Sequence, residues 1–160
     1  MGIRRAVAGD AASMSALAIK AKQHWGYSQA QMDIWRQDLL ISEEILASTH
    51  AYVLELDRRL VGFYVLSMEF SGASASAARD CVLEHLWVAP EHMRQGHGRA
   101  LLAHACNMAR RLDLRRVRID ADPYALNFYL ACGAKQLGEI AAPIEGDPGR
   151  VRPQLALKLD

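Results

Sequence analysis

The chain has 160 residues, of which 51% are hydrophobic and 23% charged, and its formal net charge at pH 7 is +1. This composition is typical of a soluble globular protein, and the length predicts a single domain, residues 1–160, with a hydrophobic core. The net charge gives no general attraction to nucleic acid or to a membrane surface. Because there is no long apolar run and no signal-peptide pattern, we expect a cytoplasmic protein without a nucleic-acid or membrane partner.

The cysteines and histidines give no metal-binding pattern. Three cysteines, an odd number, lie far apart in the sequence, which argues against a disulfide framework and fits a reducing compartment. None of the six histidines pairs with a cysteine or a carboxylate at a spacing typical of metal ligands. We therefore expect no metal site.

The first third of the chain predicts one strand and three helices. Residues 3–7 read as a short strand, and Asp10 as the N-cap of a helix through residue 23. Ser28 is placed to cap a second helix that reaches residue 39, and Ser42 opens a short third one.

A hairpin follows these helices. Residues 51–56 and 60–68 read as two strands joined by Asp57-Arg58-Arg59. Gly62, near the start of the second strand, suggests a bulge or a close approach of another backbone. Residues 71–78 are small, polar and alanine-rich, and predict a surface loop.

The next stretch is the centre of the sequence. Residues 82–88 predict a central strand that Pro90 brings to an end, and a long helix reaches Leu112. One face of this helix is apolar and carries Leu101, Ala105, Met108 and Leu112. On or near the other side lie Arg99, His104, Asn107 and Arg111.

The loop between this strand and helix has the features of a phosphate site. Gly96 and Gly98 let a backbone approach a ligand closely, and the first amides of the helix have no helical partners. Arg94 and Arg99 add positive charge. The alternative, a basic solvated turn, stays open on spacing alone. The loop lacks the lysine of a Walker motif, and Leu101 replaces the third glycine of a dinucleotide fingerprint.

The last third predicts three strands and one helix. Residues 116–119 follow the long helix closely enough to pair in parallel with the central strand. Asp122 and Pro123 begin a helix that Gly133 ends. Two more strands, 135–140 and 154–159, follow, separated by a loop rich in glycine and proline. The element order therefore predicts a mixed α/β fold with one parallel crossover.

The residues resemble the GCN5-related N-acetyltransferase (GNAT) superfamily. The resemblance rests on Leu86-Trp87-Val88-x-Pro90-Glu91, on Arg94-Gln95-Gly96-His97-Gly98-Arg99-Ala100-Leu101-Leu102, and on Asp122-Pro123-x-Ala125-x-x-Phe128-Tyr129-x-x-x-Gly133-Ala134. It implies an α/β (α+β) fold in which helices flank a mixed, mostly antiparallel sheet of about six to seven strands. A splayed parallel pair would form the cofactor cleft.

The resemblance also implies an activity. The protein would transfer an acetyl group from acetyl-CoA directly to the primary amine of a small molecule or of a peptide amino terminus. A non-catalytic acetyl-CoA-binding sensor or regulatory domain is the alternative, and a homodimer is left open. The implied cofactor contacts are Leu86, Trp87, Val88, Met93, Arg94, Gln95, Gly96, His97, Gly98, Arg99, Asp122, Asn127 and Tyr129. Met93 and Asp122 depart from the usual family residues at their positions.

Three groups are candidates for the chemistry. By resemblance, Tyr129 would protonate the leaving thiolate; the other reading is a buried aromatic residue beside Phe128. Glu84, in an otherwise apolar run, is expected to be buried, which would raise its pKa and suit a general base. It would otherwise be a structural carboxylate paired with an arginine such as Arg118. His85 faces the opposite way and is the second candidate for the base.

The acceptor site is expected at two loops. Trp25 and Tyr27, between the first two helices, either contact the substrate or close the helix pair as a hydrophobic plug. Glu84 and His85 complete the expected substrate contacts. In the late loop, charged side chains could select the charge of the acceptor, namely Glu145, Asp147 and Arg150.

Overall fold

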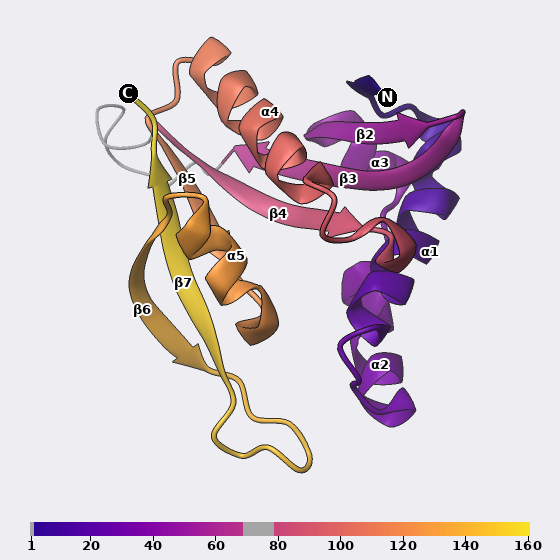
Figure 1. Cartoon of the computed structure of the whole chain (residues 1–160), viewed down its shortest axis with the longest axis vertical. Helices are drawn as coiled ribbons and strands as arrows, with labels where there is room; N and C mark the ends of the chain where they lie inside the picture. Colours follow the sequence, from indigo (N-terminus) through magenta and orange to yellow (C-terminus); the bar gives the residue numbers. More distant parts are fainter. Residues whose placement is uncertain (1, 69–78) are drawn as a thin grey trace. The chain divides into compact units, whose positions relative to one another are not determined.

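The computed structural model describes residues 2–68 and 79–160 of the chain, so the surface loop predicted over residues 71–78 lies outside the described residues. The described strands are β1 (Gly2–Arg5), β2 (His50–Leu56), β3 (Arg59–Met68), β4 (Asp80–Val88), β5 (Arg116–Asp120), β6 (Lys135–Ala141) and β7 (Val151–Lys158). The α-helices are α1 (Ala11–Gln23), α2 (Gln29–Trp35), α3 (Glu43–Ser48), α4 (His97–Arg111) and α5 (Leu126–Ala131). Four short 3-10 helices are η1 (Ala8–Asp10), η2 (Arg36–Leu39), η3 (Pro90–His92) and η4 (Pro123–Ala125). Figure 1 shows these elements along the chain.

The described strands form one sheet in the order β1-β2-β3-β4-β5-β7-β6. β4 and β5 are parallel, whereas β1–β2, β2–β3, β5–β7 and β6–β7 are antiparallel. The parallel pair is joined by α4, as a crossover between parallel strands requires. The predicted mixed, mostly antiparallel α/β fold is therefore confirmed.

The chain divides into two compact units. Unit 1 comprises residues 1–66 and 85–104, and unit 2 comprises residues 67–84 and 105–160, so that β4 and α4 contribute to both. The single domain predicted from the length stays a prediction.

Local signals explain where the helices begin and end. Ser28 and Ser42 cap α2 and α3, because each side-chain oxygen accepts a backbone N–H three residues further on at 3.1 Å. Asp122 caps η4 in a similar way at 2.9 Å. Gly133, at φ +94°, provides the left-handed residue after α5. All four were predicted.

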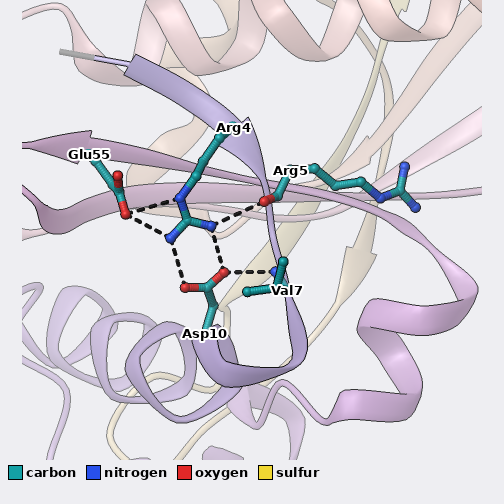
Figure 2. Close-up of polar contacts among 5 residues, drawn as sticks. All are labelled: Arg4, Arg5, Val7, Asp10 and Glu55. Carbon is teal, nitrogen blue, oxygen red and sulfur yellow. Dashed lines mark hydrogen bonds and ion pairs between the residues drawn. The ribbon is translucent and has the colours of Figure 1, made fainter.

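The prediction that Asp10 caps α1 is wrong, because its side chain makes no cap hydrogen bond there. Its own backbone is already helical, whereas a capping residue is extended. Its carboxylate instead accepts the backbone N–H of Val7 at 2.8 Å and both Nη groups of Arg4 at 2.9 and 3.0 Å. Arg4 also donates to Glu55 on β2 at 2.7 Å, so this network ties β1, β2 and η1 together (Figure 2).

The core of unit 1 comes from its helices, β2 and β3. Helix α1 buries Met14, Leu17, Ala18 and Ala21, and these pack in one cluster with residues of both strands. Asp57 and Arg58, at φ +48° and +63°, form the predicted hairpin turn between β2 and β3. On α4, Leu101 and Ala105 are buried as predicted. His104, which the sequence places on or near the other side of α4, contacts β3: its Nδ1 lies 2.8 Å from the Tyr64 hydroxyl.

The core of unit 2 lies on β4, β5 and β7. Its buried side chains include Cys81, Leu83, Val117, Ile119 and Leu155. The last strand starts at Val151, earlier than the predicted Gln154. Pro153 is tolerated inside it because its carbonyl oxygen, not the missing N–H, makes the contact: it accepts the Ala121 N–H at 2.9 Å.

No helix among the described residues has the length and apolarity needed to cross a membrane.

Candidate functional site

The loop between β4 and α4 has the backbone of an anion site. Arg94 and Gly96 both have positive φ, +59° and +87°, so the chain curls before α4 begins at His97. The Ala100 N–H bonds to the Gly96 carbonyl at 3.0 Å, which leaves the amides before it without a partner inside the helix. These amides lie at the positive end of a 15-residue helix, which favours a bound phosphate.

The side chains of this loop divide into two kinds. Arg94, Gln95 and Arg99 are exposed, while Met93 packs against the core of unit 1. His97 is 9% exposed, and its Nε2 is buried without a hydrogen-bond partner. A buried polar atom without a partner destabilises the protein, so an oxygen of an anionic ligand would improve this site. The loop therefore offers backbone amides to an anion, with the exposed arginines Arg94 and Arg99 beside them.

The second half of β4 is not paired with β5. The β4–β5 register runs from Asp80 and Arg116 to Leu83 and Ile119, and among the described residues it goes no further although β4 continues to Val88. The side chains of residues 86–88 are half-buried. Their peptide groups therefore have no partner on β5, which itself ends at Asp120, and the splayed pair that the resemblance implies stays a prediction.

Position 62 on β3 has no room for a side chain, because β4 and α4 lie close to it. A Cβ built there would lie 3.1 Å from the carbonyl oxygen of Trp87 and 2.9 Å from Cδ1 of Leu101. The predicted close approach of a backbone is thus confirmed. The bulge is confirmed as well, because the β2–β3 register shifts beside this position, between Leu54 and Glu55.

Glu84 is exposed, so the expectation of a buried carboxylate is wrong. The alternation of side chains along β4 turns it to the face opposite Leu83, which is buried. The Ser67 hydroxyl donates to its Oε1 at 2.6 Å. The carboxylate is therefore oriented by a neighbouring strand and accessible to solvent. Sequence reasoning did not find this serine, because no motif links it to Glu84.

His85 is enclosed in unit 1, where its ring lies 6.2 Å from that of Phe63. The indole N–H of Trp87 donates to its Nδ1 at 3.1 Å, so the neutral ring carries its proton on Nε2. Burial, and next the nearby Lys22 ammonium, lower the pKa of His85 to about 4. A group that is neutral and so weakly basic at pH 7 is a poor general base and a good hydrogen-bond donor.

The two aromatic residues of the α1–α2 loop have different neighbours. Tyr27 meets Trp35 edge to face at 4.7 Å and packs against the core of unit 1, as a plug would. Trp25 lies 5.7 Å from Trp87 of β4. Substrate contact by Trp25, Tyr27, Glu84 and His85 stays a prediction.

In unit 2, a buried ion pair holds the start of the α5 segment. Arg150 Nη2 donates to Asp122 Oδ2 at 3.2 Å, and the two side chains are 4% and 6% exposed. Arg150 Nη1 also donates to the Ala142 carbonyl at 3.2 Å. Arg150 is therefore committed inside the unit and does not select the charge of an acceptor, contrary to our expectation.

Tyr129 lies on α5 and is 6% exposed. Burial, and next the Cys132 thiol, raise its pKa well above the usual value, so the phenol keeps its proton at neutral pH. Its ring meets Phe128 edge to face at 5.1 Å. Asn127, in contrast, is exposed. The phenol is thus in the state that proton donation requires.

A family model described as the acetyltransferase (GNAT) family matches residues 13–134. The match covers most of the chain, including β4, Tyr129 and the loop between β4 and α4, which is called the phosphate loop below. The chain belongs to the GNAT acetyltransferase family. This result confirms the resemblance drawn from the motifs.

Solved structures of other acetyltransferases share the fold of this GNAT chain. PaiA N-acetyltransferase from Thermoplasma acidophilum, in complex with coenzyme A, is 16% identical over 98% of each chain, with a TM-score of 0.74. YncA from Salmonella typhimurium, with acetyl-CoA, is 18% identical over 100% of this chain and 94% of its own, with a TM-score of 0.73. N-acetylglutamate synthase from Neisseria gonorrhoeae, with coenzyme A and N-acetylglutamate, is 21% identical over 99% of this chain and 35% of its own, with a TM-score of 0.68. No curated protein matches the chain.

Proposed function

We propose that this GNAT chain is an N-acetyltransferase that takes its acetyl group from acetyl-CoA and passes it to a primary amine. The observation that carries the proposal is the anion site at the start of α4, because acetyl-CoA bears a pyrophosphate. The buried, unpartnered Nε2 of His97 and the free amides of the helix fit such a group. The coenzyme A and acetyl-CoA bound in the PaiA and YncA structures support the same ligand.

The residues proposed to hold acetyl-CoA have separate tasks. Residues 93–99 would bind the pyrophosphate through their backbone amides, with Arg94 and Arg99 balancing its charge. The peptide groups of Leu86, Trp87 and Val88 would bond to the pantetheine arm. Asp122 and Asn127 were further candidates; the carboxylate of Asp122 is occupied by Tyr124 and Arg150, so we assign it to structure rather than to the cofactor.

In the proposed reaction the amine nitrogen attacks the thioester carbon, the C–N bond forms and the C–S bond breaks. Glu84, directly or through water, accepts the proton that the amine loses. The Val88 N–H stabilises the negative charge on the oxygen of the tetrahedral intermediate. Tyr129 donates its proton to the leaving thiolate and is reprotonated from solvent. His85 donates a hydrogen bond to the acceptor rather than accepting a proton.

The test is thiol release from acetyl-CoA over a panel of primary amines, followed by Tyr129→Phe. We expect this variant to bind acetyl-CoA as tightly as the unchanged protein and to turn over about 100-fold more slowly, the usual contribution of a general acid. Tyr124→Phe is the matched control, because Tyr124 is 62% exposed in the same segment. Unchanged turnover in Tyr129→Phe would refute the acid role, and no release with any amine would refute the transferase.

A further inference from the structure

A short hydrogen bond in unit 2 joins Ser67 of β3 to Glu84 of β4. The Ser67 hydroxyl donates to Glu84 Oε1 at 2.6 Å. This length is in the range of about 2.5–2.7 Å that is typical of a hydroxyl bonded to a carboxylate, and such bonds are roughly twice as strong as those between neutral groups. Glu84 is exposed and Ser67 is half-buried, so the carboxylate is fixed by the sheet and still open to solvent.

Two other carboxylates of this sheet differ from Glu84, because each has a charged partner. Asp80, on the same strand, lies 2.6 Å from Arg116, and Asp120 of β5 lies 3.1 Å from an arginine of β7. Among the residues that the structure describes, Glu84 has no cationic partner, and Ser67 is its one hydrogen-bond donor. A neighbouring cation neutralises a carboxylate and makes it a weaker proton acceptor, whereas a hydroxyl orients it and adds no counter-charge.

The hydrogen bond from Ser67 restricts a side chain that would otherwise be free to turn. An exposed glutamate rotates about three torsions and samples many conformations. The serine hydroxyl lies one bond beyond Cβ on a strand, and β3 and β4 are neighbours in the sheet, so the donor is held close to the backbone that carries Glu84. Oε1 is therefore occupied. Oε2, which has no hydrogen-bond partner within the described part of the chain, is left to accept a proton.

We propose that Ser67 is a positioning residue for the acetyl transfer and acts through Glu84. This inference rests on the proposed function, in which Glu84 is the general base. As the amine nitrogen attacks the thioester carbon, its proton passes to Oε2 of Glu84, directly or through one water, while Oε1 keeps the hydrogen bond from Ser67. The carboxylic acid formed in this way then loses the proton to solvent, and the serine keeps its own proton throughout.

The first test is thiol release from acetyl-CoA with the amine of the panel that reacts fastest. Ser67→Ala should lower kcat about tenfold and change KM by less than about twofold, because the lost hydrogen bond acts on the base and not on binding. Ser67→Thr keeps a hydroxyl on a residue that favours strands and should restore most of the rate. Ser48→Ala is the matched control: this exposed hydroxyl bonds to the Glu44 carbonyl on α3 at 2.9 Å, and its loss should leave turnover unchanged.

A double-mutant cycle tests whether Ser67 acts through Glu84. Glu84→Gln should slow turnover about 100-fold, the usual effect of losing a general base. Ser67→Ala added to Glu84→Gln should have little further effect, because residues that act as a unit are not additive. A further tenfold loss in the Glu84→Gln background would overturn the inference, since the hydroxyl would then act independently of the carboxylate.

A crystal structure of Ser67→Ala gives a readout that does not depend on activity. We expect the Glu84 side chain to occupy more than one rotamer in this variant, with the backbones of β3 and β4 unchanged. A carboxylate that keeps its single position without the serine hydroxyl would overturn the inference.

The outcomes separate this inference from the proposed function. Slow turnover in Glu84→Gln together with full turnover in Ser67→Ala overturns the role of Ser67 alone. Full turnover in Glu84→Gln overturns the assignment of the base and the role of Ser67 together. Absence of thiol release from the unchanged protein with every amine overturns the transferase, and the rotamers of Glu84 in Ser67→Ala still decide whether the serine orients it.

Discussion

Two regions of the molecule are expected to serve the same reaction by different physical means. The phosphate loop, residues 93–98, offers backbone amides, and its side chains are divided between exposed Arg94 and Gln95 and less exposed Met93 and His97. The α5 segment depends on side chains, because Asp122 and Arg150 are almost completely buried against each other. A site built from backbone amides tolerates side-chain substitutions that neither change the course of the backbone nor block the ligand. A segment held by a buried ion pair tolerates the loss of neither partner.

The largest effect is expected in the loop. Gly98→Asp places bulk and a negative charge at the start of α4, where the proposed pyrophosphate binds, so affinity for acetyl-CoA should fall by about 100-fold or more. Isothermal titration calorimetry measures the change. Gly2→Asp is the control, since a Cβ there meets nothing within 4 Å. Equal binding by both variants would show that the ligand does not use these amides.

The next effect concerns the stability of the other region. Arg150→Met leaves the Asp122 carboxylate buried without its cation and should lower the free energy of unfolding by about 3 kcal/mol. Urea denaturation checks this value. Arg150→Met combined with Asp122→Asn should recover much of the loss, because asparagine keeps the cap of η4 without the charge. Failure of the double variant to recover would mean that the arginine acts mainly by packing or through Ala142.

A smaller effect, on both the unfolding free energy and the affinity for acetyl-CoA, is expected at Gly62. Gly62→Ala brings a methyl group to 3.1 Å from the Trp87 carbonyl, so β3 and β4 must separate slightly. We expect a loss of about 1–2 kcal/mol of unfolding free energy and weaker acetyl-CoA binding through the displaced β4 backbone. Thermal unfolding and calorimetry measure the two. Unaltered affinity in a destabilised variant would show that the β4 backbone does not contact the ligand.

The smallest effect is expected in the exposed network of Arg4 and Asp10, which contrasts with the buried pair of Asp122 and Arg150. The Arg4 guanidinium, assisted by the Val7 N–H, lowers the pKa of Asp10 below its usual value. Its contribution to stability is therefore present above the unfolded pKa of about 3.9 and lost as the pH falls through the lower folded pKa. Asp10→Asn should cost about 1 kcal/mol or less at pH 7. Urea curves of both proteins should converge near pH 2; a constant difference would contradict the assignment.

Local chemistry explains why much of the fold was predictable. Ser28, Ser42, Asp122 and Gly133 act on the few residues beside them, and α4 needs only its own apolar spacing. Asp10 misled the prediction because an arginine on another strand uses its carboxylate. The start of β7 was placed too late because the contact of Pro153 comes from Ala121, distant in sequence.

By itself the sequence determined the elements, the glycine loop and the family, since each depends on residue types at short, fixed spacings. Only the tertiary structure decided the state of each polar group. Glu84 is exposed and accepts a hydrogen bond from Ser67. His85 is enclosed and accepts a hydrogen bond from Trp87. Arg150 is paired with Asp122. Burial and hydrogen bonding depend on which strands become neighbours, and no spacing along the chain records that.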